Sequence, residues 1–81
     1  MSATGPDTLQ RLQDVFRDVL DQPGLVLARE TTADQVEGWD SLTNVRLMVA
    51  TEMEFGTRFD TAGINSLRNV GDLVDLIGAA A

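Results

Sequence analysis

Residues 36–56, VEGWDSLTNVRLMVATEMEFG, decide the fold. Asp40 and Ser41, an acid and a hydroxyl residue, come just before apolar residues at helical spacing. This predicts a helix that opens at Asp40-Ser41, runs to about Phe55 and is ended by Gly56. At 3.6 residues per turn this helix has two apolar arcs on nearly opposite sides, where an ordinary surface helix has one. The first arc consists of Asn44, Leu47, Met48, Thr51 and Phe55, and the second of Leu42, Val45, Val49 and Met53.

The two arcs need different neighbours. We assign the first arc to the core, through Leu47, Met48 and Phe55. A bundle of 81 residues is too small to surround a helix completely, so the second arc is predicted to be a surface for a partner protein. The alternative is that the segment at 22–40 covers the second arc, which would make it part of the core.

The N-terminal half predicts one helix and a long connection. Apolar residues at helical spacing predict a helix at 7–21, capped by Asp7 and ended by the Pro-Gly pair that follows. The connection at 22–40 is unusually long for so small a domain, and such loops are often functional. We expect residues 25–27 to enter the core and residues 31–36 to form one helical turn.

The C-terminal part predicts two more helices. A brief helix is expected at 61–66, capped by Asp60, and a longer one follows Asn69 as its cap. The predicted fold class is therefore all-α: a four-helix bundle with three longer helices, one short helix and a long first loop. We expect a flexible lead-in at 1–6, the domain at 7–78 and a frayed tail at 79–81.

Composition excludes several classes of function. The chain has no cysteine and no histidine, which removes disulfides, the commonest metal ligands and every Ser-His or Cys-His catalytic arrangement. No apolar run is long enough for a membrane helix, and the first residues lack the pattern of a signal peptide. We therefore expect a cytoplasmic protein that is not an enzyme and binds no metal.

The charge points to basic partners. Thirteen acids against six Arg give a net charge of −7, and residues 30–60 carry seven of the acids but two of the Arg. Nucleic acid and anionic lipid bind through basic patches, so neither is an expected partner.

The tetrapeptide Trp39-Asp40-Ser41-Leu42 carries the clearest functional signal. Taken alone, Asp-Ser before an apolar helix is only a good cap. Its context resembles the acyl carrier protein family, whose signature Asp-Ser-Leu opens the second of four helices. The chain also matches the family at Glu52-Met53-Glu54-Phe55-Gly56 and at Val70-Gly71-Asp72-Leu73-Val74. The resemblance covers residues 7–78 and implies an acyl-carrier-like bundle.

The resemblance implies a modified serine. Ser41 would carry 4′-phosphopantetheine, which a separate phosphopantetheinyl transferase moves from coenzyme A onto its hydroxyl. The arm would hold acyl intermediates as thioesters, and free N–H groups at the helix N-terminus would favour its phosphate. Other expected partners are acyl-loading and acyl-processing enzymes with basic or apolar docking patches, and we expect a monomer. The expected partner-binding residues are Asp40, Leu42, Val45, Arg46, Val49, Glu52 and Met53.

Departures from the family pattern bear on the pathway. Many fatty-acid carriers have acids where this chain has Thr43 and Arg46, and Thr51 stands where a large apolar residue is usual, which suggests a looser core. The string Gly-Trp-Asp-Ser-Leu-Thr looks more like discrete carriers of specialised metabolism, so polyketide or related biosynthesis is the leading hypothesis. A peptidyl or aminoacyl carrier is an alternative, against which Asp40 argues. An unmodified docking module that uses the second arc is another. Trp39 is expected to pack the loop against the helix.

Overall fold

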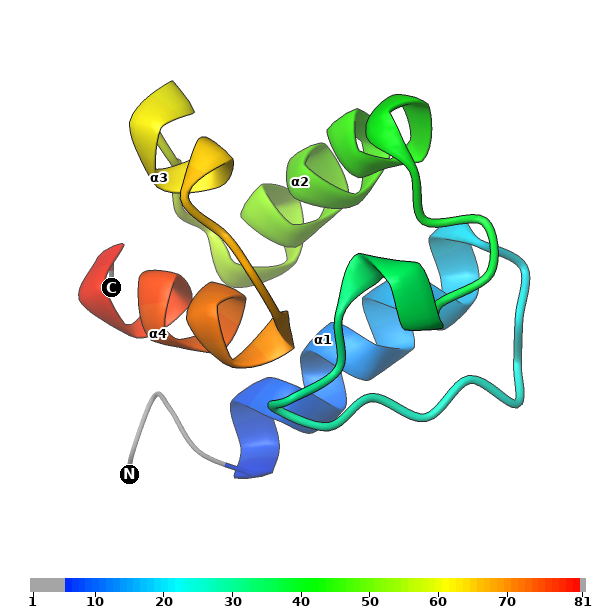
Figure 1. Cartoon of the computed structure of the whole chain (residues 1–81). Helices are drawn as coiled ribbons and strands as arrows, with labels where there is room; N and C mark the ends of the chain where they lie inside the picture. The colour runs from blue at the N-terminus through cyan, green and yellow to red at the C-terminus, as the bar shows by residue number, and fades with distance from the viewer. Residues whose placement is uncertain (1–5, 81) are drawn as a thin grey trace.

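The structure is a computed structural model, and it describes residues 6–80. Figure 1 shows α1 packed against both α2 and α4, with the long loop running along one side of α1. The described residues contain helices and no strand, which confirms the predicted all-α class. The helical elements are α1 (Pro6–Val19), the 3₁₀ turn η1 (Ala33–Gln35), α2 (Ser41–Phe55), α3 (Thr61–Asn65) and α4 (Val70–Ala80).

The bounds of α1 differ from the prediction at both ends. The helix begins at Pro6, a residue suited to the first turn because it has no N–H to leave unpaired, so Asp7 lies inside the helix. It ends at Val19, because Asp21 takes a left-handed conformation with φ of 54°. The N–H of Gln22 then bonds the carbonyl of Arg17 at 2.9 Å, which closes the helix before the Pro-Gly pair is reached.

Three helices and the loop build one core. α1, α2 and α4 each turn one apolar stripe inward, and the long loop adds two side chains from between them. The loop therefore enters the core as predicted for residues 25–27: Leu27 is buried and Leu25 is half-buried against the core, whereas Val26 is exposed. The buried apolar residues are Leu12, Phe16, Leu27, Val36, Leu47, Met48, Val70, Leu73, Val74 and Ile77.

The long loop is held to the helices by backbone hydrogen bonds. The N–H of Leu27 donates to the Gln13 side chain at 2.9 Å, on α1. At the other end of the loop, the N–H groups of Val70 and Gly71 donate to the carbonyls of Thr31 and Arg29, at 2.8 and 2.7 Å. These bonds give the first turn of α4 the acceptors that a helix N-terminus needs. The single helical turn expected at 31–36 is present as η1.

The C-terminal helix is longer than predicted. The Asn69 side chain accepts from the N–H of Asp72 at 2.8 Å, as expected of a cap. α4 then continues to Ala80, so residues 79 and 80 are helical where a frayed tail was expected. The lead-in expected at 1–6 lies outside the described residues except for Pro6, which is helical. No helix in residues 6–80 combines the length and apolarity needed to cross a bilayer.

Candidate functional site

A reciprocal pair of hydrogen bonds fixes the start of α2. The Asp40 carboxylate accepts from the N–H groups of Leu42 and Thr43, both at 3.0 Å. In return, the Thr43 hydroxyl oxygen accepts from the N–H of Asp40 at 2.9 Å. This is a capping box, and it confirms that Asp40 is the N-cap. The same hydroxyl donates to the carbonyl of Gly38, so Thr43 also ties the loop to the helix.

The cap has an electrostatic consequence. The hydrogen bond from the Thr43 N–H is the largest influence on the Asp40 carboxyl, and together with the other bonds of the cap it lowers the pKa of Asp40 below its ordinary value. Asp40 is therefore negatively charged at neutral pH. A fixed carboxylate stands immediately before the first residue of α2.

Ser41 is that first residue. Its side chain is exposed, and its hydroxyl has no hydrogen-bond partner among residues 6–80. A serine hydroxyl is a weak nucleophile at neutral pH unless a base is placed beside it. With no histidine in the chain, Ser41 needs a base from another protein to react.

A pocket opens beside Ser41. Its volume is about 470 Å³, within the range of small-molecule sites. The turn η1, the beginning of α2 and the end of α3 surround it, so segments far apart in the sequence meet there. The residues that line it are Ala33, Asp34, Trp39, Asp40, Ser41, Asn44, Ile64 and Leu67.

Trp39 forms one wall of this pocket. Its ring meets the ring of Phe16 edge-on, with centroids 4.9 Å apart and planes at 88°. Its indole N–H donates to the side-chain oxygen of Asn44 at 2.9 Å. Trp39 therefore packs the loop against the helices, as the sequence predicted, and also shapes the space next to Ser41.

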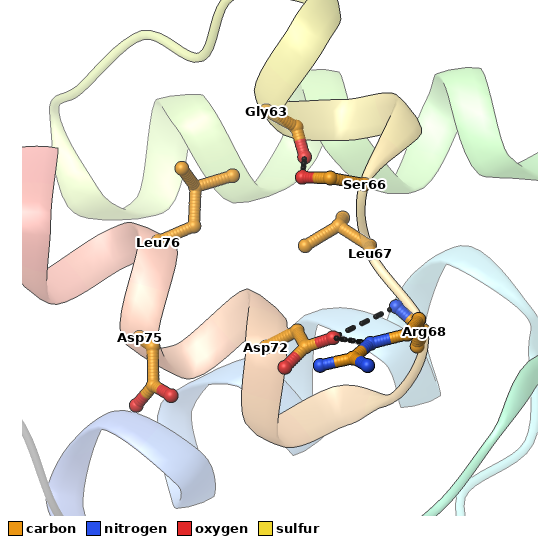
Figure 2. A pocket seen from close by; sticks show the side chains of 7 residues that line it. All are labelled: Gly63, Ser66, Leu67, Arg68, Asp72, Asp75 and Leu76. Atoms are coloured by element: carbon orange, nitrogen blue, oxygen red, sulfur yellow. Dashed lines mark hydrogen bonds and ion pairs between the residues drawn. The ribbon is translucent and has the colours of Figure 1, made fainter.

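A second pocket, of about 500 Å³, lies between α3 and α4 (Figure 2). Leu67 and Leu76 line it, but the polar groups around it are already paired. The Ser66 hydroxyl donates to the carbonyl of Gly63 at 2.9 Å, and Arg68 bonds Asp72 through its backbone N–H and its side chain (Figure 2). This pocket offers no free hydroxyl, so the pocket beside Ser41 is the better candidate.

The second apolar arc of α2 is exposed. The exposed fractions are 80% for Leu42, 64% for Val45, 49% for Val49 and 79% for Met53. The loop at 22–40 therefore does not cover this arc, and the alternative that placed it in the core is wrong. We call these four residues the exposed face of α2.

Charged residues around this face differ in what they contact. Arg46 is exposed and has no ion-pair partner within residues 6–80. Glu52 is half-buried, and its carboxylate accepts from the N–H of Phe59 at 2.9 Å, which holds the link between α2 and α3. Glu54 pairs with Arg11 of α1 at 3.1 Å. Of these three charges, Arg46 is the one that forms no ion pair or hydrogen bond with the described residues.

The sequence located Ser41, its cap and the exposed face, but it did not reveal the pocket or the bond between Trp39 and Asn44. The pocket depends on how η1, α2 and α3 meet, which no local pattern encodes. The only sign of the bond in the sequence is that Trp39 and Asn44 are five residues apart, on either side of the start of the helix.

Comparison with known proteins supports this site. Residues 10–77 match the family model described as "Phosphopantetheine attachment site". The chain is 30% identical over 77 residues to Acyl carrier protein 3 of Ralstonia nicotianae, covering 95% of this chain and 88% of that relative. The solution NMR structure of a holo acyl carrier protein from Geobacter metallireducens superposes with a TM-score of 0.84 at 40% identity, covering 90% of this chain and 84% of that one. The chain therefore belongs to the acyl carrier protein family, whose members act as carriers rather than enzymes and use covalently attached 4′-phosphopantetheine.

Proposed function

We propose that Ser41 carries the 4′-phosphopantetheine arm and that the chain is a discrete carrier for polyketide or related biosynthesis. The observation that carries the first part is the exposed, unbonded hydroxyl of Ser41 at the first position of α2. Family membership implies interaction with a phosphopantetheinyl transferase and with biosynthetic enzymes. The thiol of the arm supplies the sulfur that this cysteine-free chain lacks, and acyl groups are held on it as thioesters.

The residues around Ser41 fit such a group in a specific way. A phosphate at this position gains from the dipole of α2. However, the Asp40 carboxylate already accepts hydrogen bonds from the N–H groups of Leu42 and Thr43. Of the N–H groups in the first turn, only that of Ser41 is left to bond the phosphate. The expected benefit from free N–H groups is therefore smaller than the sequence suggested. Asp40 orients Ser41 by fixing the helix start, and it leaves the hydroxyl open to a transferase.

The polyketide part of the proposal rests on the string Gly-Trp-Asp-Ser-Leu-Thr at 38–43, and the surface of α2 indicates the chemistry of a partner enzyme. The exposed face of α2 is apolar, and Arg46 adds a positive charge within an acidic chain. A partner that fits it presents an apolar patch with an acid opposite Arg46. We expect Arg46→Glu to weaken loading by such a partner and to strengthen binding to generic basic partners. An aminoacyl carrier is the second candidate, and it is distinguished by whether acyl-loading or amino-acid-activating enzymes use the chain.

The attachment site is tested by intact mass. The protein is incubated with coenzyme A, Mg²⁺ and a promiscuous phosphopantetheinyl transferase. We expect the mass of one phosphopantetheine to be added to the wild type and lost in Ser41→Ala. Ser66→Ala is the matched control, because Ser66 is also exposed but its hydroxyl is bonded, and this variant should still gain the mass. A gain that persists in Ser41→Ala would place the arm elsewhere, and no gain in any variant would favour an unmodified docking module.

A further inference from the structure

The short helix α3 has little packing of its own. It consists of five residues, and none of them is buried. It also packs against the other helices less than α1 packs against α2 and α4 (Figure 1). A helix of this length is not stable by itself in water. The position of α3 therefore depends on the segments that join it to α2 and α4.

Three hydrogen bonds join the link between α2 and α3 to one residue, Glu52. At the end of α2, the backbone carbonyl of Glu52 accepts from the N–H groups of Gly56 and Thr57. Its side-chain carboxylate accepts from the N–H of Phe59 at 2.9 Å. Phe59 packs against the core, and the next residue, Asp60, is the N-cap of α3. One carboxylate thus holds the segment that leads directly into α3.

The other end of α3 lies beside Ser41. Ile64, in α3, and Leu67, just after it, line the same pocket as Ser41. An enzyme that reaches the Ser41 hydroxyl therefore meets α3 as well. Glu52 itself is about three turns further along α2. It can influence Ser41 through α3 without touching what binds there.

Two roles for Glu52 make different demands on its side chain. Partner binding, the role expected from the sequence, needs a negative charge that can meet a base. In the structure, however, Glu52 is half-buried and one of its carboxylate oxygens bonds Phe59. An anchor, meaning a residue that holds the link in place, needs an acceptor oxygen at the reach of a glutamate side chain and needs no charge.

We infer that Glu52 is a positioning residue, whose acceptor oxygen fixes α3 beside Ser41 and whose charge is not required. The inference rests on the proposed attachment at Ser41, because the step that it serves is the transfer of phosphopantetheine to that hydroxyl. The neighbouring acid Glu54 has no such role. Its carboxylate pairs with Arg11 of α1 and, among residues 6–80, bonds no part of the link.

Two substitutions at Glu52 separate the acceptor from the charge. Glu52→Gln keeps an acceptor oxygen at the same reach and removes the charge. Glu52→Asp keeps the charge but is shorter by one methylene, so its carboxylate no longer reaches the N–H of Phe59. Glu54→Gln and Glu54→Asp are the matched controls, since they make the same changes in charge and helix propensity two positions further along α2.

The experiment has two readouts. The first is hydrogen exchange at the Phe59 amide of the unmodified protein, followed by NMR. The second is kcat/KM for transfer from coenzyme A by a promiscuous phosphopantetheinyl transferase, followed by intact mass. We expect Glu52→Asp to speed exchange at Phe59 about 10- to 100-fold and to lower kcat/KM about 3- to 10-fold. Glu52→Gln and both Glu54 variants should stay within about 5-fold of the wild type in exchange and about 2-fold in kcat/KM.

The inference requires transfer to depend on the acceptor and not on the charge. Normal transfer in Glu52→Asp with slow transfer in Glu52→Gln would assign the charge to a partner and overturn it. Equal exchange at Phe59 in all variants would overturn it too, as would faster exchange with an unchanged kcat/KM. The buried Leu47 amide is the control for global unfolding. If its exchange accelerates as much as that of Phe59, Glu52 only stabilises the fold and the positioning role is overturned.

Two further results remain interpretable. If the wild type gains no phosphopantetheine mass, the proposed function fails, whereas exchange at Phe59 still decides whether Glu52 holds the link. If Glu52→Asp does not fold, Glu52→Gln decides alone. Full kcat/KM with a protected Phe59 amide then supports the acceptor role, and a loss of kcat/KM with a protected amide overturns it.

Discussion

The hydroxyl of Thr51 donates to the carbonyl oxygen of Leu47, one turn earlier in α2, at 2.7 Å, and neither residue is exposed to solvent. A threonine buried in an apolar core would be costly if its hydroxyl had no partner. Here the helix backbone supplies the acceptor. The departure from the family's large apolar residue at this position is therefore accommodated locally.

This contact predicts opposite effects for two substitutions. Thr51→Val keeps the shape and removes the hydroxyl together with its need for a partner, so we expect the free energy of unfolding to stay within about 1 kcal/mol or to rise. Thr51→Leu adds volume at a fully buried site and should cost about 1–3 kcal/mol, in contrast to the gain that a looser core would allow. Denaturant unfolding of both variants measures the difference. A more stable Thr51→Leu would show unfilled space at this position.

The Asp40 cap predicts a dependence of stability on pH. The folded-state pKa of Asp40 is lowered, so its charged form stabilises the fold above the ordinary aspartate pKa of about 4. That contribution is lost as the pH falls through the lower folded-state pKa. Asparagine also caps helices but cannot lose a charge, so Asp40→Asn should weaken the fall in stability on the acid side. Thermal melts at a series of pH values from neutral to 3 test this, and identical slopes in both proteins would contradict it.

The exposed face of α2 predicts a variant that folds but functions poorly. Val49→Asp places a charge in the middle of an apolar surface, at a residue that is half exposed. Its thermal midpoint should change little, since exposed substitutions usually cost within about 0.5 kcal/mol. Its rate of acyl loading by the cognate enzyme should fall, because docking would bury an unpaired carboxylate.

Val26→Asp is the control for this test. It makes the same substitution at a residue that is 72% exposed but lies on the long loop. We expect it to keep both the melting midpoint and the loading rate. A loading defect in Val26→Asp with none in Val49→Asp would show that the docking surface lies on the loop. Unfolding of Val49→Asp would show that Val49 belongs to the core.

At Gly71, even the methyl group of an alanine should destabilise the folded protein. A Cβ at this residue would lie 2.9 Å from the carbonyl oxygen of Arg29, a backbone atom that cannot move without the loop. We expect Gly71→Ala to cost about 1–3 kcal/mol in the free energy of unfolding. Gly24→Ala is the control, because a Cβ there meets no atom within 4 Å and the variant should be neutral or slightly more stable. Equal stability of the two variants would show that the loop yields freely.

The parts of the fold that the sequence predicted are those set by local chemistry. The start of α2 at Ser41 follows from the Asp40 cap, and its end follows from Gly56, which takes a left-handed conformation with φ of 63°. The first arc of α2 faces the core as predicted: Leu47 and Met48 are buried, and Phe55 is half-buried against it. The second arc is the exposed face. Helical periodicity and capping rules need no knowledge of distant residues.

The parts that it missed depend on contacts between distant segments. The guanidinium of Arg11 lies 4.4 Å from the centre of the Phe55 ring and also bonds Glu54, which ties the beginning of α1 to the end of α2. Nothing near Arg11 in the sequence indicates this. The end of α1 was misplaced for a different reason: aspartate tolerates the left-handed conformation, so Asp21 ended the helix before the expected proline.

The hydrogen bonds from Val70 and Gly71 to the loop bear on the motion of two regions, the long loop and the start of α4. These two amide hydrogens exchange with deuterium when the carbonyls of Thr31 and Arg29 leave them, so we expect exchange at both positions to report separation of the loop from the start of α4. Leu67 lies three residues before Val70, and Asp34 lies three residues after Thr31, and both line the pocket beside Ser41. The same opening event therefore moves two walls of that pocket.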